Sequence, residues 1–325
     1  MTLPLSLSRC SCATLFAGWL LALPATAQPP AGLGGPSANE TLSATTSYSD
    51  TNRLESGGLR VGEVSVTSLQ ASFGSGTTTG PGYRFSYGLD YGHFRLDRSP
   101  GVPLPGKLQE ISLPLGLAGK LAQDWTGRLM LRPGLYATSL AFSSGSVNVP
   151  VLALVSFRQS ADLSWTMGLR YDAWSRHTLL PFAGVNWKFA PRWELSVGMP
   201  RTGVSWQFHD AATLRAGASL QGGSFQVGGD PRPTGSSAPA LGATKLDYRE
   251  IRLGVGLDLF RKNPVSLLVD AGAIVSQRFE YPRRHYRLAG GTAAFAALAR
   301  SSPLLTERPA NESACAATLS AAHAG

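Results

Sequence analysis

The sequence predicts an all-β protein, a single antiparallel transmembrane β-barrel of about 12 strands within a range of about 10 to 14. Three observations favour this class. Apolar residues alternate with small or polar residues in one segment after another, which is the period of a β-strand. Glycine is abundant, at 37 residues, and only 15% of residues are charged, which suits a chain with many strands and turns. No helical stretch is evident before Tyr286.

Residues 1–27 have the form of a secretory signal peptide. Arg9 precedes an apolar run from Cys12 to Leu23, and a small-x-small cleavage site ends at Ala27. The run is too short to cross a bilayer as a helix. We therefore expect an exported chain whose mature part begins with a Pro/Gly-rich linker over residues 28–40.

The expected barrel domain covers residues 41–300, where alternating segments follow one another. In "GYRFSYGLDYG" the aromatic residues from Tyr83 to Tyr91 share one face. Beyond Gly92 the apolar positions change parity, so that Phe94 and Leu96 become the apolar set. A change of this kind at a glycine predicts a β-bulge.

Later segments repeat the alternation and are separated by turns of two kinds. Tight turns are expected near Asp124, Asp162 and Pro191, and a long loop from Gly228 to Gly242. Short turns on one side and longer loops on the other are typical of a membrane barrel. The clearest alternating segments are Ile111–Leu117, Leu163–Tyr171, Gly184–Phe208, Ile251–Leu259 and Val265–Ala273.

The two faces of these segments differ in composition, the polar face being small or charged and the apolar face aromatic or leucine-rich. In a barrel the first set lines the lumen and the second faces lipid, with aromatic girdles at the interfaces. A soluble sheet with its apolar face inside is the alternative. The candidate lumen-lining residues are Arg84, Asp90, Arg170, Asp172, Lys188, Glu194, Arg252, Asp258 and Asp270. The candidate lipid-facing aromatic residues are Tyr83, Phe85, Tyr87, Trp165, Trp187, Phe189 and Trp193.

The formal net charge of +9 indicates a preference for anionic partners. We expect contact with outer-membrane lipids and lipopolysaccharide, although a genome that favours arginine codons explains the same excess. Nucleic acid is not an expected partner, because there is no basic helix and no aromatic RNA-binding signature. No cofactor is expected, and the scattered histidines form no metal-site pattern.

The pieces "GVNWKF", "PRTG" and "DYREIR" resemble a bacterial family of outer-membrane β-barrels known as domain of unknown function 6268. The resemblance covers roughly residues 41–286. It implies architecture, an outer-membrane location and insertion by the barrel-assembly machinery, and it implies no known activity or catalytic residue. One departure is the C-terminus, since such barrels commonly end on an aromatic residue, whereas residues 301–325 are expected to be a disordered tail.

Two loops contain residues of the catalytic type. Ser175 and His177 follow Asp172 in "YDAWSRHT", and His209 precedes Asp210 in a second loop. Nearness in sequence does not make a triad, so no catalytic residue is predicted.

The sequence therefore favours a non-enzymatic barrel, either a small-solute pore or a structural barrel closed by an internal salt-bridge network. A lipid hydrolase with its active site in an extracellular loop is one alternative. A secreted soluble β-protein that binds an apolar ligand is the other.

Overall fold

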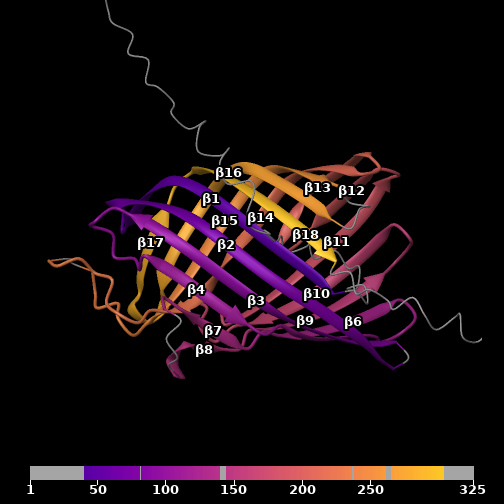
Figure 1. Cartoon of the computed structure of the whole chain (residues 1–325), viewed down its shortest axis with the longest axis horizontal. Helices are drawn as coiled ribbons and strands as arrows, with labels where there is room; N and C mark the ends of the chain where they lie inside the picture. Colours follow the sequence, from indigo (N-terminus) through magenta and orange to yellow (C-terminus); the bar gives the residue numbers. More distant parts are fainter. Residues whose placement is uncertain (1–39, 81, 140–143, 236–237, 261–264, 304–325) are drawn as a thin grey trace, which may run out of the picture.

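In a computed structural model the chain forms one closed sheet, in which consecutive strands pair antiparallel (Figure 1). The structure describes residues 40–80, 82–139, 144–235, 238–260 and 265–303, so the expected signal peptide, most of the linker and most of the tail lie outside it. No helix in this part of the chain is long and apolar enough to span a membrane. The strands are β1 Thr41–Ser56, β2 Leu59–Gly80, β3 Tyr83–Arg98, β4 Lys107–Ser112, β5 Leu115–Lys120, β6 Trp125–Leu131, β7 Gly134–Ala137, β8 Val147–Asn148, β9 Val151–Arg158, β10 Leu163–Tyr171, β11 Leu179–Ala190, β12 Trp193–Val197, β13 Arg201–His209, β14 Ala212–Gln226, β15 Lys245–Leu259, β16 Ser266–Tyr281, β17 Tyr286–Gly290 and β18 Ala293–Pro303, with 3-10 turns η1 Ser144–Ser146 and η2 Pro282–Arg284.

The 18 segments build 14 wall strands, because some consecutive segments continue one strand. β4 and β5 both pair with β3, and β17 and β18 both pair with β16. β6 with β7, and β8 with β9, continue each other in the same way. β1 closes the wall by pairing with both β2 and β18.

The predicted antiparallel barrel is therefore confirmed. The central estimate of about 12 strands is not confirmed, because the wall has 14 strands, which is the upper end of the expected range. Two features of the sequence explain why alternation underestimates the number of strands. β1 consists largely of Ser and Thr and shows little apolar alternation. β12 and β13 read as a single alternating tract, although the chain turns between them at residues 198–200.

The barrel has a turn end and a loop end. At the turn end β1 starts at Thr41 opposite Pro303, the last residue of β18. β18 thus extends into the range expected for the tail. The tight turns expected near Asp124, Asp162 and Pro191 lie on this side. The loop end carries the segments 99–106, 172–178 and 227–244, the last of which contains the predicted long loop.

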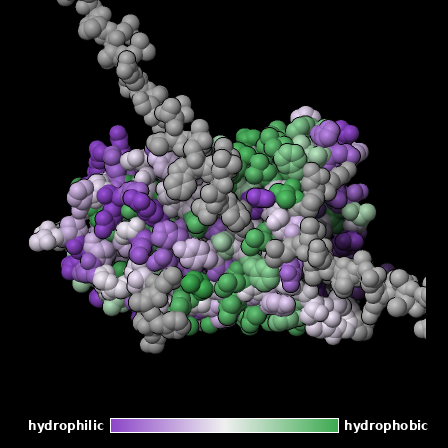
Figure 2. All heavy atoms as spheres, in the orientation of Figure 1, coloured by the Kyte–Doolittle hydropathy of each residue, from purple (hydrophilic) through white to green (hydrophobic). Residues whose placement is uncertain are grey.

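Alternation along each strand separates an exposed apolar face from an inner face. On β15, Ile251, Leu253 and Val255 are 42, 47 and 52% exposed, whereas Tyr248 and Arg252 on the opposite face are 1 and 3% exposed. The apolar side chains gather in a band across the middle of the barrel, with hydrophilic side chains on both sides of it (Figure 2). A band of this kind around a barrel is the surface that faces lipid.

Three neighbouring wall strands break at the same level, each beside a proline. The interruptions lie at Pro114 between β4 and β5, at Pro133 between β6 and β7, and at Pro150 between β8 and β9. Proline has no N–H to donate, so the ladder cannot continue regularly through these positions. The amides of Leu113 and Arg132 still donate to the carbonyls of Pro133 and Pro150, both at 2.9 Å, and hold the strands together across the break.

Beyond this break the loop end narrows. β7 meets β14, a strand that is distant along the wall, at the parallel pair Ala137 and Gln226. The amide of Thr138 also donates to the carbonyl of Gln226 at 3.0 Å. As a result β1 to β4, β7 and β14 to β17 pair into a closed ring that leaves out β8 to β13.

A hydrophobic core, which we call the plug core, fills this ring. Every strand of the ring contributes to it, and so do the two loops 99–106 and 227–244. Tyr281 on β16 ties the first of these loops in place by donating its hydroxyl to the carbonyl of Pro103 at 3.1 Å. The plug core consists of Leu54, Val64, Val66, Phe94, Leu96, Val102, Leu104, Leu108, Tyr136, Phe225, Val227, Leu241, Leu246, Tyr248, Phe279, Tyr281 and Leu288.

The prediction of a β-bulge at Gly92 is wrong, and the plug core explains the pattern that suggested it. The ladder between β2 and β3 runs without a shift through Gly92, and its one irregularity lies near Gly80. The side chains therefore keep their faces, but their surroundings change along the strand. Leu89 is 46% exposed on the outside, whereas Phe94, on the inner face, is 5% exposed in the plug core.

Four inward-facing glycines form one hydrogen-bonded row across β13 to β16, in the order Gly203, Gly217, Gly254 and Gly272. A Cβ added at Gly217 would lie 2.6 Å from the Cα of Gly203, and one at Gly272 would lie 2.5 Å from the Cα of Gly254. Neighbouring backbones approach each other on the inner face at this row, which is the geometry of a strongly curved wall. Only glycine leaves room for this curvature.

We expect Gly217→Val to reduce the folded fraction strongly, because overpacking typically costs about 1–3 kcal/mol and the obstructing atoms here belong to backbone. Electrophoresis without heating, in which a closed barrel migrates differently from the boiled chain, measures that fraction. Ala216→Val adds similar bulk on the exposed face of the same strand and should fold normally. Equal folding of the two variants would contradict the curvature that we assign to this row.

Candidate functional site

The inner face of the barrel is the candidate site, and a buried ion pair lies on it next to the plug core. Arg252, a predicted lumen residue, is 3% exposed and donates from Nε to Glu250 Oε2 at 2.9 Å. Glu250 is fully buried and also accepts from Gln277 at 2.8 Å and from the hydroxyl of Tyr248. A buried charge such as that of Glu250 is tolerated only when it is paired and hydrogen-bonded in this way. Arg252 therefore helps to seal the lumen at this level.

A second cluster lies at the proline break. Arg132 donates from Nη2 to Asp90 Oδ2 at 2.6 Å, and the same nitrogen lies 3.8 Å from Glu110 Oε1. The backbone carbonyl of Arg132 accepts from the hydroxyl of Tyr136 at 3.0 Å. Asp90 was predicted to face the lumen, but Arg132 and Glu110 were not recognised. The alternation stops at Pro133, so sequence periodicity cannot assign Arg132 to a face.

On the opposite wall the charges are paired across strands. Arg201 Nη2 lies 3.5 Å from Asp270 Oδ2, and Arg215 Nη2 lies 3.7 Å from Asp258 Oδ2. The structure places both predicted acidic residues on the inner face, as the register of β13 to β16 shows. Their arginine partners were not predicted, because alternation gives the face of a residue and only the register gives its neighbour.

Four further predicted lumen residues lie elsewhere on this face. Arg84 faces inward on β3, and its Nε and Nη2 are buried without a hydrogen-bond partner in the described part of the chain. Lys188 and Glu194 lie near the turn end on β11 and β12, where Lys188 is exposed. Arg170 faces inward on β10 and donates to Asp172 at 3.0 Å.

Asp172 does not continue the inner face. It follows the last residue of β10 and is 2% exposed. Its carboxylate accepts from Asn148 at 2.9 Å and from Ser224 at 3.2 Å, which places it in the seam between β8 and β14. Asp172 therefore lies in a buried seam beyond the end of β10, where strand alternation no longer applies, and not on the open inner face that the sequence predicted for it.

The predicted lipid-facing aromatic residues lie on the exposed face, and several form a continuous ladder near the turn end. Ring centroids lie 5.7 Å apart for Trp187 and Phe189, 6.2 Å for Phe189 and Trp193, and 5.5 Å for Trp193 and Trp206. Contacting aromatic rings near the edge of an apolar band are typical of an interfacial girdle. The relative exposures are 50% for Tyr83, 45% for Tyr87, 46% for Trp165, 47% for Trp187, 45% for Phe189 and 39% for Trp193, and Phe85 is half-buried.

The loop between β10 and β11 holds the serine and histidine considered for hydrolysis. Ser175 donates its hydroxyl to Asp247 Oδ2 at 3.1 Å and accepts from Arg249 at 3.0 Å. Among the described contacts none joins Ser175 to His177, which is exposed. In a triad the serine hydroxyl donates to a histidine, whereas here it donates to a carboxylate that is paired with an arginine, so this loop has the geometry of an ion network and not of a triad. No group of described residues is arranged to hold a metal ion.

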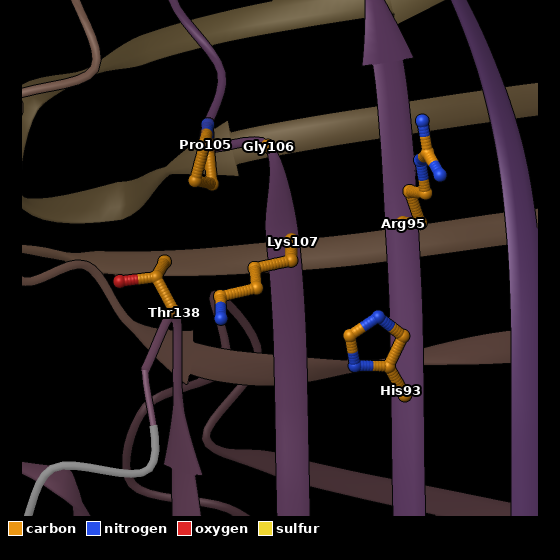
Figure 3. Close-up of a pocket in the computed structure, with 6 residues that line it drawn as sticks. All are labelled: His93, Arg95, Pro105, Gly106, Lys107 and Thr138. Atoms are coloured by element: carbon orange, nitrogen blue, oxygen red, sulfur yellow. The ribbon is translucent and has the colours of Figure 1, made fainter.

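An open groove of about 500 Å³ lies outside the wall at the loop end (Figure 3). It is lined by His93 and Arg95 of β3 and by Lys107 at the start of β4, with Thr138 opposite. On β3 the basic side chains of the groove begin at His93, two residues after Tyr91. They lie at the edge of the exposed apolar band.

Comparison with known families identifies the family of the chain. The model of the domain of unknown function 6268 matches residues 83–289, more than half of the chain. The chain belongs to this family. The resemblance that the sequence motifs indicate is thereby confirmed. No curated protein matches the chain.

Several solved outer-membrane barrels are similar to this member of the family. An outer-membrane channel of Pseudomonas putida F1 is 10% identical, with 85% of this chain and 99% of that chain covered and a TM-score of 0.49. A mutant of the monoaromatic hydrocarbon channel TodX is 12% identical, with 83% and 91% covered and a TM-score of 0.49. The translocator domain of NalP from Neisseria meningitidis is 16% identical, with 84% and 91% covered and a TM-score of 0.38.

We expect Arg252→Met to destabilise the barrel by about 3–5 kcal/mol, because it leaves Glu250 charged and buried without its partner. Unfolding in urea, followed by loss of the folded band, measures the change. The double variant Glu250→Gln, Arg252→Met should recover most of the loss. Arg95→Met breaks the exposed pair with Asp97 and should cost less than about 1 kcal/mol. A single variant as mild as this control would contradict a structural role for the buried pair.

Proposed function

We propose that the protein is a non-enzymatic outer-membrane barrel whose lumen is open at the turn end and closed at the loop end. The observation that carries this proposal is the plug core, whose side chains are no more than 5% exposed. Toward the turn end the inner face is accessible, since Lys188, Lys120 and Gly217 are exposed. A barrel with one closed end is better suited to binding or gated passage than to free diffusion.

The orientation follows from the unequal connections. Outer-membrane barrels have short turns on the periplasmic side and longer loops on the outside. The turn end therefore faces the periplasm in this proposal, and the plug core lies toward the cell exterior. Insertion by the barrel-assembly machinery belongs to the same proposal.

The other functions considered fit the geometry less well. A continuously open small-solute pore requires a path through the plug core and the sealed pair of Glu250 and Arg252. A hydrolase in the loop at Ser175 requires a histidine at the serine hydroxyl, where the structure has Asp247 and Arg249. A soluble protein would expose the aromatic ladder to water, and contiguous apolar surfaces of that size are normally covered.

Planar-bilayer recording tests the closed end. We expect the wild-type barrel to show no steady conductance. The double variant Tyr248→Ala, Phe279→Ala removes two rings that stack 4.9 Å apart in the plug core and should produce open-channel steps. The control Leu253→Ala, Val255→Ala truncates two exposed side chains on β15 and should remain silent. Steady conductance of the wild type would contradict the proposal.

The proposal also includes anionic lipid of the outer leaflet as a partner, supported by the basic groove of His93, Arg95 and Lys107. The phosphates of lipopolysaccharide are opposite in charge to Arg95 and Lys107. We expect Arg95→Glu, Lys107→Glu to reduce the lipopolysaccharide that copurifies with the barrel. Arg53→Glu, Arg60→Glu changes the charge equally at another exposed site of the loop end and should have little effect. Equal retention by both variants would remove the groove from the proposal.

A further inference from the structure

We propose that the open part of the lumen contains a binding site for an amphipathic carboxylate, formed by Arg84 and Arg128 together with apolar side chains beside them. This inference rests on the accessible lumen of the proposed function and adds a ligand class to it.

One hydrogen-bonded row carries the whole site. Arg84 on β3 pairs with Ala118 on β5, and Ala118 pairs with Arg128 on β6. Arg128 pairs in turn with Leu154 on β9, and the row then continues through Gly168 to Phe182. Residues that are paired directly across strands point to the same face. The row therefore presents two guanidinium groups and then an apolar surface, all toward the lumen.

Among the described residues no carboxylate lies within ion-pair distance of Arg84 or Arg128, in contrast to three other inward arginines. Arg201, Arg215 and Arg252 each lie within 4 Å of a carboxylate. In the described part of the chain Arg84 has two buried guanidinium nitrogens without a hydrogen-bond partner, and the charge that acts on Arg128 is that of Arg84. Buried donors without partners and neighbouring like charges are both costly. A bound anion removes both costs.

The spacing suits a carboxylate. Because adjacent strands lie about 4.8 Å apart, the backbones of Arg84 and Arg128 are separated by about 10 Å. Ala118 between them has a short side chain, so it leaves space above the wall for a small anionic group. Two long guanidinium side chains that flank such a space can both donate to one carboxylate, with the charge-assisted geometry that arginine favours.

The apolar part of the row indicates what the carboxylate is attached to. Leu154 and Phe182 lie over Gly168, where an added Cβ would lie 2.6 Å from Leu154 Cδ2. Met130 and Leu152 form the next inward pair toward the loop end. An apolar patch in an otherwise polar lumen is the usual lining of a ligand site with a few polar anchors. It begins about 5 Å from Arg128 and extends to about 15 Å, which fits a hydrocarbon chain of medium length.

The test is calorimetric titration of the barrel in lipid nanodiscs, with empty nanodiscs subtracted. Octanoate is the probe, acetate supplies the head alone, and 1-octanol supplies the body alone. We expect wild-type protein to bind octanoate more tightly than either. In Arg84→Gln, Arg128→Gln the Kd for octanoate should rise at least about tenfold, as expected when charge-assisted hydrogen bonds are lost.

The matched control is Lys120→Gln, Arg158→Gln, which removes two inward cations outside the row and should change the Kd by less than about twofold. Leu154→Ser, Phe182→Ser keeps both arginines and should lower octanoate binding to the level of acetate. This variant tests the site even if the arginine variant does not fold, and the heat-dependent band shift checks folding of each.

Wild-type binding of octanoate no tighter than that of acetate or 1-octanol would overturn the inference. An unchanged Kd for octanoate in the folded double variant Arg84→Gln, Arg128→Gln would also overturn the inference, because water would then be the partner of these arginines. Failure of the proposed closed lumen is a separate result, since it appears as steady conductance of the wild type in bilayers and leaves octanoate binding unaffected.

Discussion

Closure of the backbone hydrogen-bond ladder is the constraint on which the rest of the structure depends. In lipid no water is available to satisfy a free strand edge, so a sheet must pair its first strand with its last. β1 does this by pairing with β18 while it also pairs with β2. Once the wall is closed, the period of two along each strand creates an outer face and an inner face, and every side chain is assigned to one of them.

At the narrowed loop end the backbone hydrogen-bond ladder closes a second time. Three proline breaks interrupt the wall at one level, and beyond them β7 pairs with β14 to close a smaller ring. Inside this ring the inner face is no longer next to water, so apolar residues replace polar ones without any change of face. Phe94 and Tyr248 are buried for this reason, although the same face carries Arg84 and Asp258 nearer the turn end.

The sequence predicts those features that depend on local alternation. Trp165, Trp187 and Trp193 were assigned to the exposed face because lipid selects the same chemistry at every second position. The ring was not predictable, since it depends on a single pairing between residues as distant in the chain as Ala137 and Gln226. Ion pairs such as Arg215 with Asp258 require the register between strands, which alternation does not contain.

The distribution of arginine gives the basic charge a structural meaning. On β13 to β16 each inward arginine faces an acidic residue, which balances the charge within the wall. On β3 to β6 the inward pair Arg84 and Arg128 has Ala118 between its members where a carboxylate would balance it. Much of the basic charge lies on the exposed surface, as at Arg53, Arg60 and Arg95. The pair Arg84 and Arg128 differs because it lies inside the lumen beside an apolar surface, where a solute entering from the turn end would meet both charge and hydrocarbon.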